Sequence, residues 1–116
     1  MGIRHTINDQ ASVDNFEIDL GNGAVMTTYA ANGFVRGGQE RVDDVTTPNE
    51  RSLSFLVTYD DFDFLISGDL IGRDSGAEDA KVEEAVSQAI NADGRVVDVL
   101  HVNHHGADNG LSLIHI

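Results

Sequence analysis

The stretch SLSFLVTYDDFDFLISGDL, residues 52–70, decides the fold. It contains two runs in which apolar and polar residues alternate, and Asp60 and Asp61 separate the runs. Alternation with a period of two is typical of β-strands, and adjacent aspartates are typical of a turn. The stretch therefore predicts a β-hairpin. Its second strand is apolar on both sides at Leu65, as central strands usually are, and it ends at Ser67-Gly68-Asp69. One side of the first strand comprises Leu53, Phe55, Val57 and Tyr59.

Upstream of this hairpin, residues 16–29 predict another. Phe16, Ile18 and Leu20 alternate with polar residues, and Gly21-Asn22-Gly23 supplies the turn before the chain returns. Residues 31–51 are polar, contain glycines and hold the only proline. This composition predicts a long, mobile loop between the two hairpins.

Downstream, residues 75–94 contain the one clear helical pattern. Ser75 and Glu78 form a capping box, and Gly94 is a plausible stop. An apolar stripe with helical spacing runs through Val82, Ala85, Val86, Ala89 and Ile90. Residues 96–103 then predict a buried strand. A strand, a helix and a strand in this order imply a parallel, right-handed crossover, so the expected fold class is α/β.

Composition narrows the possible functions. The 116 residues suffice for one small domain, and the absence of cysteine excludes disulfides and thiolate metal sites. No apolar run is long enough to cross a membrane. The net charge of −13 repels nucleic acid unless a cation mediates, and no basic patch is present. Aspartate outnumbers glutamate by 14 to 6 and arginine outnumbers lysine by 6 to 1, a bias typical of halophilic proteins; an ordinary acidic protein is the alternative.

The two parallel strands end in residues that can carry chemistry. Gly68-Asp69 follows the first strand, and His104-His105-Gly106 follows the second. Ligand sites in such sheets lie at the carboxyl ends of the strands, where a carboxylate and an imidazole suit Zn²⁺, Mn²⁺ or Fe. Each motif alone also fits an ordinary turn, and the two together supply few ligands.

A further motif extends this pattern. Asn49 and Ser52 open the first hairpin in an N-x-x-S arrangement, ahead of Ser67-Gly68-Asp69 and His104-His105-Gly106. Together these motifs resemble the C-terminal half of the metallo-β-lactamase superfamily, in the branch of the ComEC-like competence-protein hydrolase domain. The resemblance covers residues 49–106 well and residues 16–48 loosely. It departs at Ala107, where the family usually has serine.

The resemblance implies specific roles. Asp69 would bridge or complete a site for two metal ions, most often zinc, and His104 would be a ligand or a proton shuttle. His105 would either support a neighbouring metal ligand or take part in proton transfer. Asn49 would contact water or substrate, although an ordinary loop cap is an equal alternative for this residue. The family's H-x-H-x-D-H metal motif is expected upstream and is not matched at His5.

The resemblance also implies that the chain is part of a larger domain. Residues 1–110 would form part of an αββα metallo-β-lactamase-type sandwich that lacks its N-terminal metal-motif half. Residues 111–116, LSLIHI, match the translation of a sequencing adapter, the alternative being a short native strand. Half of a sandwich is expected to leave sheet edges and one apolar face uncovered.

The expected function is metal-dependent hydrolysis. The substrate implied is a phosphodiester such as DNA, or a related ester, held through the metal ions rather than through basic side chains. The alternative is a binding or structural domain of the same fold without activity, which a degraded upstream H-x-H-x-D-H motif would indicate. The sequence predicts neither the cellular location nor the oligomeric state.

Overall fold

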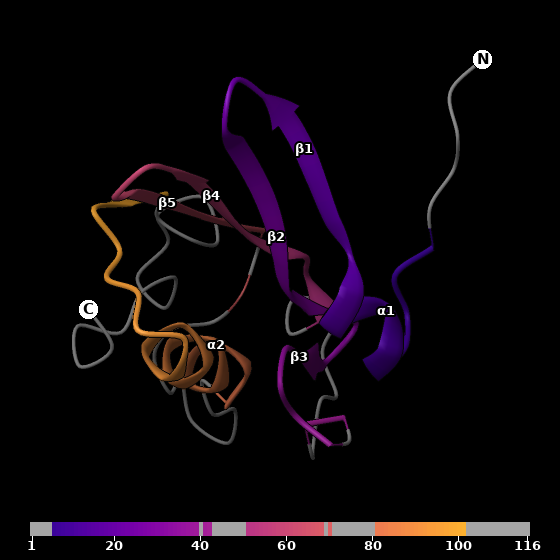
Figure 1. Ribbon diagram of the computed structural model, residues 1–116. Coiled ribbons are helices and arrows are strands. Elements are labelled where there is room, and N and C mark those ends of the chain that lie inside the picture. The colour runs from indigo at the N-terminus through magenta and orange to yellow at the C-terminus, as the bar shows by residue number, and fades with distance from the viewer. Residues whose placement is uncertain (1–5, 40, 43–50, 69, 71–80, 102–116) are drawn as a thin grey trace.

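The protein forms a small α/β domain around one mixed sheet (Figure 1). The computed structural model describes residues 6–39, 41–42, 51–68, 70 and 81–101. The elements, in chain order, are α1 (Gln10–Asn15), β1 (Glu17–Gly21), β2 (Ala24–Ala31), β3 (Phe34–Val35), β4 (Ser54–Tyr59), β5 (Phe62–Ser67), α2 (Lys81–Ala92) and β6 (Val99–Leu100). The six-stranded sheet has the order β1-β2-β4-β5-β6, with β3 paired to β2. Only the β5–β6 pair is parallel among the described strands.

Both predicted hairpins are confirmed. β1 pairs with β2 and β4 with β5, each antiparallel. Asn22 and Asp60 adopt positive φ angles of 55° and 49° in the two turns, a conformation that Asn and Asp tolerate better than most residues. β5 lies between β4 and β6, so its prediction as a central strand is also confirmed.

Three local features differ from the expectations. The short helix α1 was not predicted, and β3 falls within the expected loop at 31–51. The buried strand predicted at 96–103 is shorter in its described part, because Val96 to Asp98 do not join β6, and none of its described residues is buried. Here the backbone NH of Asp98 donates to the carbonyl of Asp63, and its carboxylate accepts from the NH of Asp63. Asp98 thus holds this segment beside β5 with a side-chain contact in place of a regular ladder.

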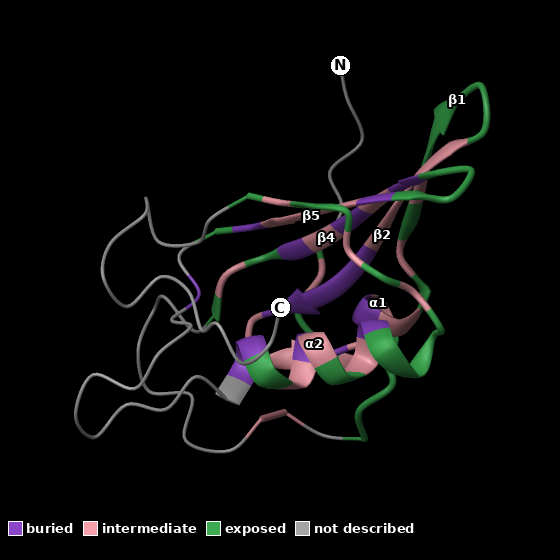
Figure 2. Ribbon diagram, turned by 90° about the vertical axis from the view of Figure 1, so that its left-hand side faces the viewer, coloured by how far each residue is buried: buried purple, intermediate pink, exposed green. Residues whose placement is uncertain are grey.

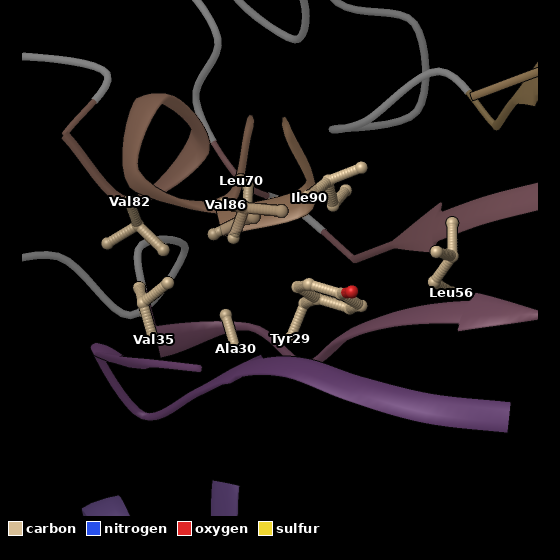
Figure 3. Packing of buried hydrophobic residues seen from close by; sticks show 8 residues of the cluster. All are labelled: Tyr29, Ala30, Val35, Leu56, Leu70, Val82, Val86 and Ile90. Carbon is tan, nitrogen blue, oxygen red and sulfur yellow. The ribbon is translucent and has the colours of Figure 1, made fainter. Parts of the chain in front are cut away.

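The main core lies between the sheet and α2 (Figures 2 and 3). The helix contributes the apolar stripe predicted for it, with Val82, Val86 and Ile90 buried. The sheet contributes Tyr29, Ala30, Val35 and Leu56 to this cluster, and Leu70, which follows β5, completes it. This packing lets a 12-residue helix persist that would be marginal in isolation.

The Tyr29 hydroxyl links the sheet to the C-terminal end of α2 by a hydrogen bond. It donates a 2.6 Å hydrogen bond to Asp93 Oδ2, just beyond the helix. Burial, followed by this hydrogen bond, raises the pKa of Tyr29 above the ordinary value of 10.0. The protonated phenol is therefore favoured in the folded state, so its contribution to stability is complete below pH 10 and is lost as the pH rises further.

Tyr29→Phe is expected to lower the free energy of unfolding at pH 7 by about 1 kcal/mol, because one partly buried hydrogen bond is lost. The same variant should also lose part of the alkaline destabilisation, since the buried phenol of residue 29 is no longer there to ionise. Urea unfolding at pH 7 and at pH 11 measures both effects. An unchanged difference between the two pH values in Tyr29→Phe would show that Tyr29 is not responsible for it.

Candidate functional site

The four residues predicted to form the site, Asn49, Asp69, His104 and His105, lie outside the described residues. The structure does describe the strands that lead to Asp69 and to the histidines. β5 and β6 are parallel, with Phe64 opposite Val99 and Leu65 opposite Leu100. The NH of His101 continues this pairing by donating to the carbonyl of Leu65 at 2.9 Å. The expectation that both strands run toward the same edge of the sheet is therefore confirmed.

The N-x-x-S segment and the S-G-D segment meet beside this edge. The NH of Gly68 donates to the carbonyl of Leu53 at 3.1 Å, which extends the β4–β5 ladder by one step. A Cβ atom on residue 68 would lie only 3.1 Å from both Cβ and Oγ of Ser52. Glycine at this position therefore lets the two segments approach closely. The motifs that the sequence places 16 residues apart are thus neighbours in the fold.

A buried pair of hydroxyls lies directly before Gly68. The Oγ atoms of Ser54 and Ser67 are 2.7 Å apart, and the two residues are cross-strand partners at the open ends of β4 and β5. Both side chains are buried, so the contact satisfies polar groups that would otherwise be costly. Ser54 does not belong to any of the motifs predicted from the sequence. A small polar residue placed opposite Ser67 in hairpin register was the available signal.

The acidic residues at the other end of β5 have a structural role. Asp63 Oδ1 lies 2.9 Å from Arg95 Nη1, and the Asp63 side chain is buried while the arginine remains partly exposed. Together with the Asp98 contacts described above, this ion pair ties the segment after α2 to the strand. These carboxylates are already engaged and lie at the strand end remote from Gly68, so they are not candidates for the site.

The His101 side chain is exposed just after β6. No group of three or more histidine and carboxylate side chains in the described part of the chain is arranged to hold a metal ion. Within the same residues, no helix is long and apolar enough to span a membrane.

Comparisons with protein-family models, with curated proteins and with solved structures found no match to this chain.

Proposed function

We propose that this chain carries the C-terminal half of a metal-dependent hydrolase of the metallo-β-lactamase superfamily, in the ComEC-like branch, acting on phosphodiesters. The observation that carries the proposal is that the strands leading to two of the motifs run in parallel toward one sheet edge, where part of the third motif packs against Gly68. β5 and β6 run in parallel toward Asp69 and His104, and Ser52 of the N-x-x-S segment packs against Gly68. Ligand sites of α/β sheets occur at such carboxyl edges.

The packing of the sheet supports the finer αββα assignment. α2 covers one face of the sheet, and the buried apolar cluster beneath it takes in residues of β2, β3 and β4. On the other face, Tyr59, Phe62 and Val99 are exposed although they are large and apolar. One sheet with a helix on one side and an uncovered apolar face on the other is what half of an αββα sandwich would present.

The donor set proposed for the site fits two divalent cations, with zinc preferred and Mn²⁺ or Fe as alternatives. It contains a carboxylate and imidazoles and, in a cysteine-free chain, no thiolate. Divalent ions bound there would supply the central chemistry, since they polarise phosphate oxygens and lower the pKa of water toward about 7.

Each side chain has a separate task in this proposal. Asp69 holds cations through its carboxylate, and His104 either binds a cation through an imidazole nitrogen or moves a proton beside it. His105 assists proton transfer, and the Asn49 amide orients substrate or water. The strongly acidic chain has no complementary attraction for phosphate, so the substrate is held through the cations.

The proposal is tested on a longer chain of the parent gene that includes the upstream H-x-H-x-D-H motif. Hydrolysis of bis(p-nitrophenyl) phosphate with Zn²⁺ or Mn²⁺ is expected for the longer chain. The 116-residue chain alone should bind these ions weakly and hydrolyse nothing, because a catalytic zinc site normally needs three protein ligands. An inactive longer chain with full metal occupancy would favour the binding-domain alternative.

His104→Ala in the longer chain distinguishes the two roles of this residue. If His104 is a ligand, bound metal is lost together with activity. If it moves a proton, metal content is retained and turnover falls by about 10²–10⁴-fold. Metal analysis beside phosphodiesterase rates measures both, and His101→Ala is the matched control because His101 is exposed outside the proposed site. Unchanged metal content and unchanged turnover in His104→Ala would remove His104 from the mechanism.

A further inference from the structure

The two residues that flank Asp69 in the sequence are both held by contacts of the described chain. On one side, the NH of Gly68 donates to the carbonyl of Leu53 at 3.1 Å. On the other side, the Leu70 side chain is 0% exposed and belongs to the cluster beneath α2 (Figure 3). The proposed metal ligand is therefore preceded by a residue that is bonded across the hairpin and followed by a residue that is anchored in the core.

A buried pair of serine hydroxyls lies next to the Gly68 contact. Ser67 immediately precedes Gly68, and its Oγ lies 2.7 Å from the Oγ of Ser54, its partner in register. Both side chains are buried, and Ala30, which is opposite Ser54 on β2, belongs to the apolar cluster. In a buried, apolar environment a hydrogen bond between two hydroxyls is strong and favours one geometry.

This position in the sheet needs such a restraint. The close approach of Ser52 requires glycine at position 68, and glycine has no side chain to limit its backbone freedom. Ser54 and Ser67 are the last pair in the register of β4 and β5, where the end of a ladder would otherwise open most easily. The hydroxyl pair joins the two strands at that last step, directly before the glycine.

We propose that Ser54 and Ser67 are positioning residues for the metal site, because their hydroxyl pair fixes the backbone that leads to Asp69. The inference rests on the proposed function, in which the carboxylate of Asp69 holds cations. Both serines act through the backbone of Gly68 rather than by binding a cation themselves. Groups that orient a metal ligand typically change metal affinity by about 10–100-fold.

Three variants of the longer chain, which includes the upstream H-x-H-x-D-H motif, separate positioning from stability. Ser54→Ala and Ser67→Ala each leave one buried hydroxyl without its partner, so each should unfold at a lower urea concentration than the wild type. The double variant removes both hydroxyls, so it should regain most of the lost stability. Affinity for Zn²⁺ should not follow this order. It should fall by about 10–100-fold in all three variants alike, because each of them breaks the same bond.

Thr58→Val is the matched control. Thr58 is buried on the same side of β4, at the end remote from Gly68, and its hydroxyl donates to the carbonyl of Val25 at 3.5 Å. The substitution removes a buried hydroxyl from the same strand without touching the pair. It should therefore leave the affinity for Zn²⁺ unchanged.

Calorimetric titration with Zn²⁺ alone and urea unfolding of the metal-free chains measure the two quantities without a hydrolysis assay. Wild-type affinity in the double variant would overturn the inference and leave the proposed function intact, since the pair would then serve stability alone. Equal weakening by Thr58→Val would overturn it as well, because the loss of any buried hydroxyl of β4 would then suffice. A longer wild-type chain that binds no Zn²⁺ would instead refute the proposed function, and this inference with it.

Discussion

Asp69→Ala is expected to be the most damaging single change in this part of the hydrolase once the upstream metal motif is present. The substitution removes the one charged ligand that this half of the domain contributes, so two neighbouring cations lose an anion that offsets their mutual repulsion. The loss of metal affinity and activity should exceed the roughly 10–100-fold typical of groups that only support a ligand. Activity should not recover at saturating Zn²⁺ or Mn²⁺, since the geometry of the pair depends on the carboxylate.

Rates on bis(p-nitrophenyl) phosphate and metal content of the purified longer chain measure this effect. Asp61→Ala is the matched control, because Asp61 is an exposed residue in the β4–β5 turn, at the opposite end of the same strand. It should leave both quantities unchanged. Full activity of Asp69→Ala would end the hydrolase proposal in its present form, whatever the activity of the control.

The arrangement of the strands around the site was predictable from the sequence, because turn residues and crossover connections determine strand pairing by strict rules. Asn22 and Asp60 supply the turns, and the hairpin registers follow from them. The helix between β5 and β6 requires these strands to be parallel, which places their ends together. Ser54 was not predicted, since its buried contact with Ser67 depends on which side of the sheet the helix covers.

The missed elements are short ones that rest on distant contacts. α1 has only six residues, too few for a helical period to stand out. Its N-cap is Asp9, which accepts from the NH of Ser12, and the side chain of Gln10 donates to the carbonyl of Val35 in β3. β3 itself has two residues and pairs with the end of β2. Tertiary contacts, which the sequence pattern does not encode locally, hold this helix and this strand in place.

The alternation of residues in β4 predicted which side chains share a side of the strand, but it did not predict which of the two sides the helix covers. The side with more apolar residues, which includes Phe55 and Val57, points away from α2. The side beneath α2 instead holds Ser54, Leu56 and Thr58, all buried. Both hydroxyls are hydrogen-bonded there. The Ser54 hydroxyl pairs with the Ser67 hydroxyl, and the Thr58 hydroxyl donates to the carbonyl of Val25. Leu56 is therefore the one large apolar side chain that β4 contributes to the covered core.

Leu56→Ala is accordingly expected to lower the free energy of unfolding by about 2–5 kcal/mol, through lost burial and the cavity that remains. Leu56 is 0% exposed and belongs to the cluster with Tyr29 and α2. Such a loss is a large part of the roughly 5–15 kcal/mol that stabilises a typical domain, so the variant should be partly unfolded near 37 °C.

Leu53→Ala makes the comparison specific, because it deletes the same atoms beside the same strand. Leu53 is 46% exposed and, by strand alternation, lies on the side of the sheet away from α2, so its truncation should cost less than about 1 kcal/mol. Urea unfolding of both variants, followed at the same chain concentration, measures the two costs. Equal destabilisation by the two substitutions would mean that α2 does not define the principal core. A cost confined to Leu53→Ala would place the core on the other side of the sheet.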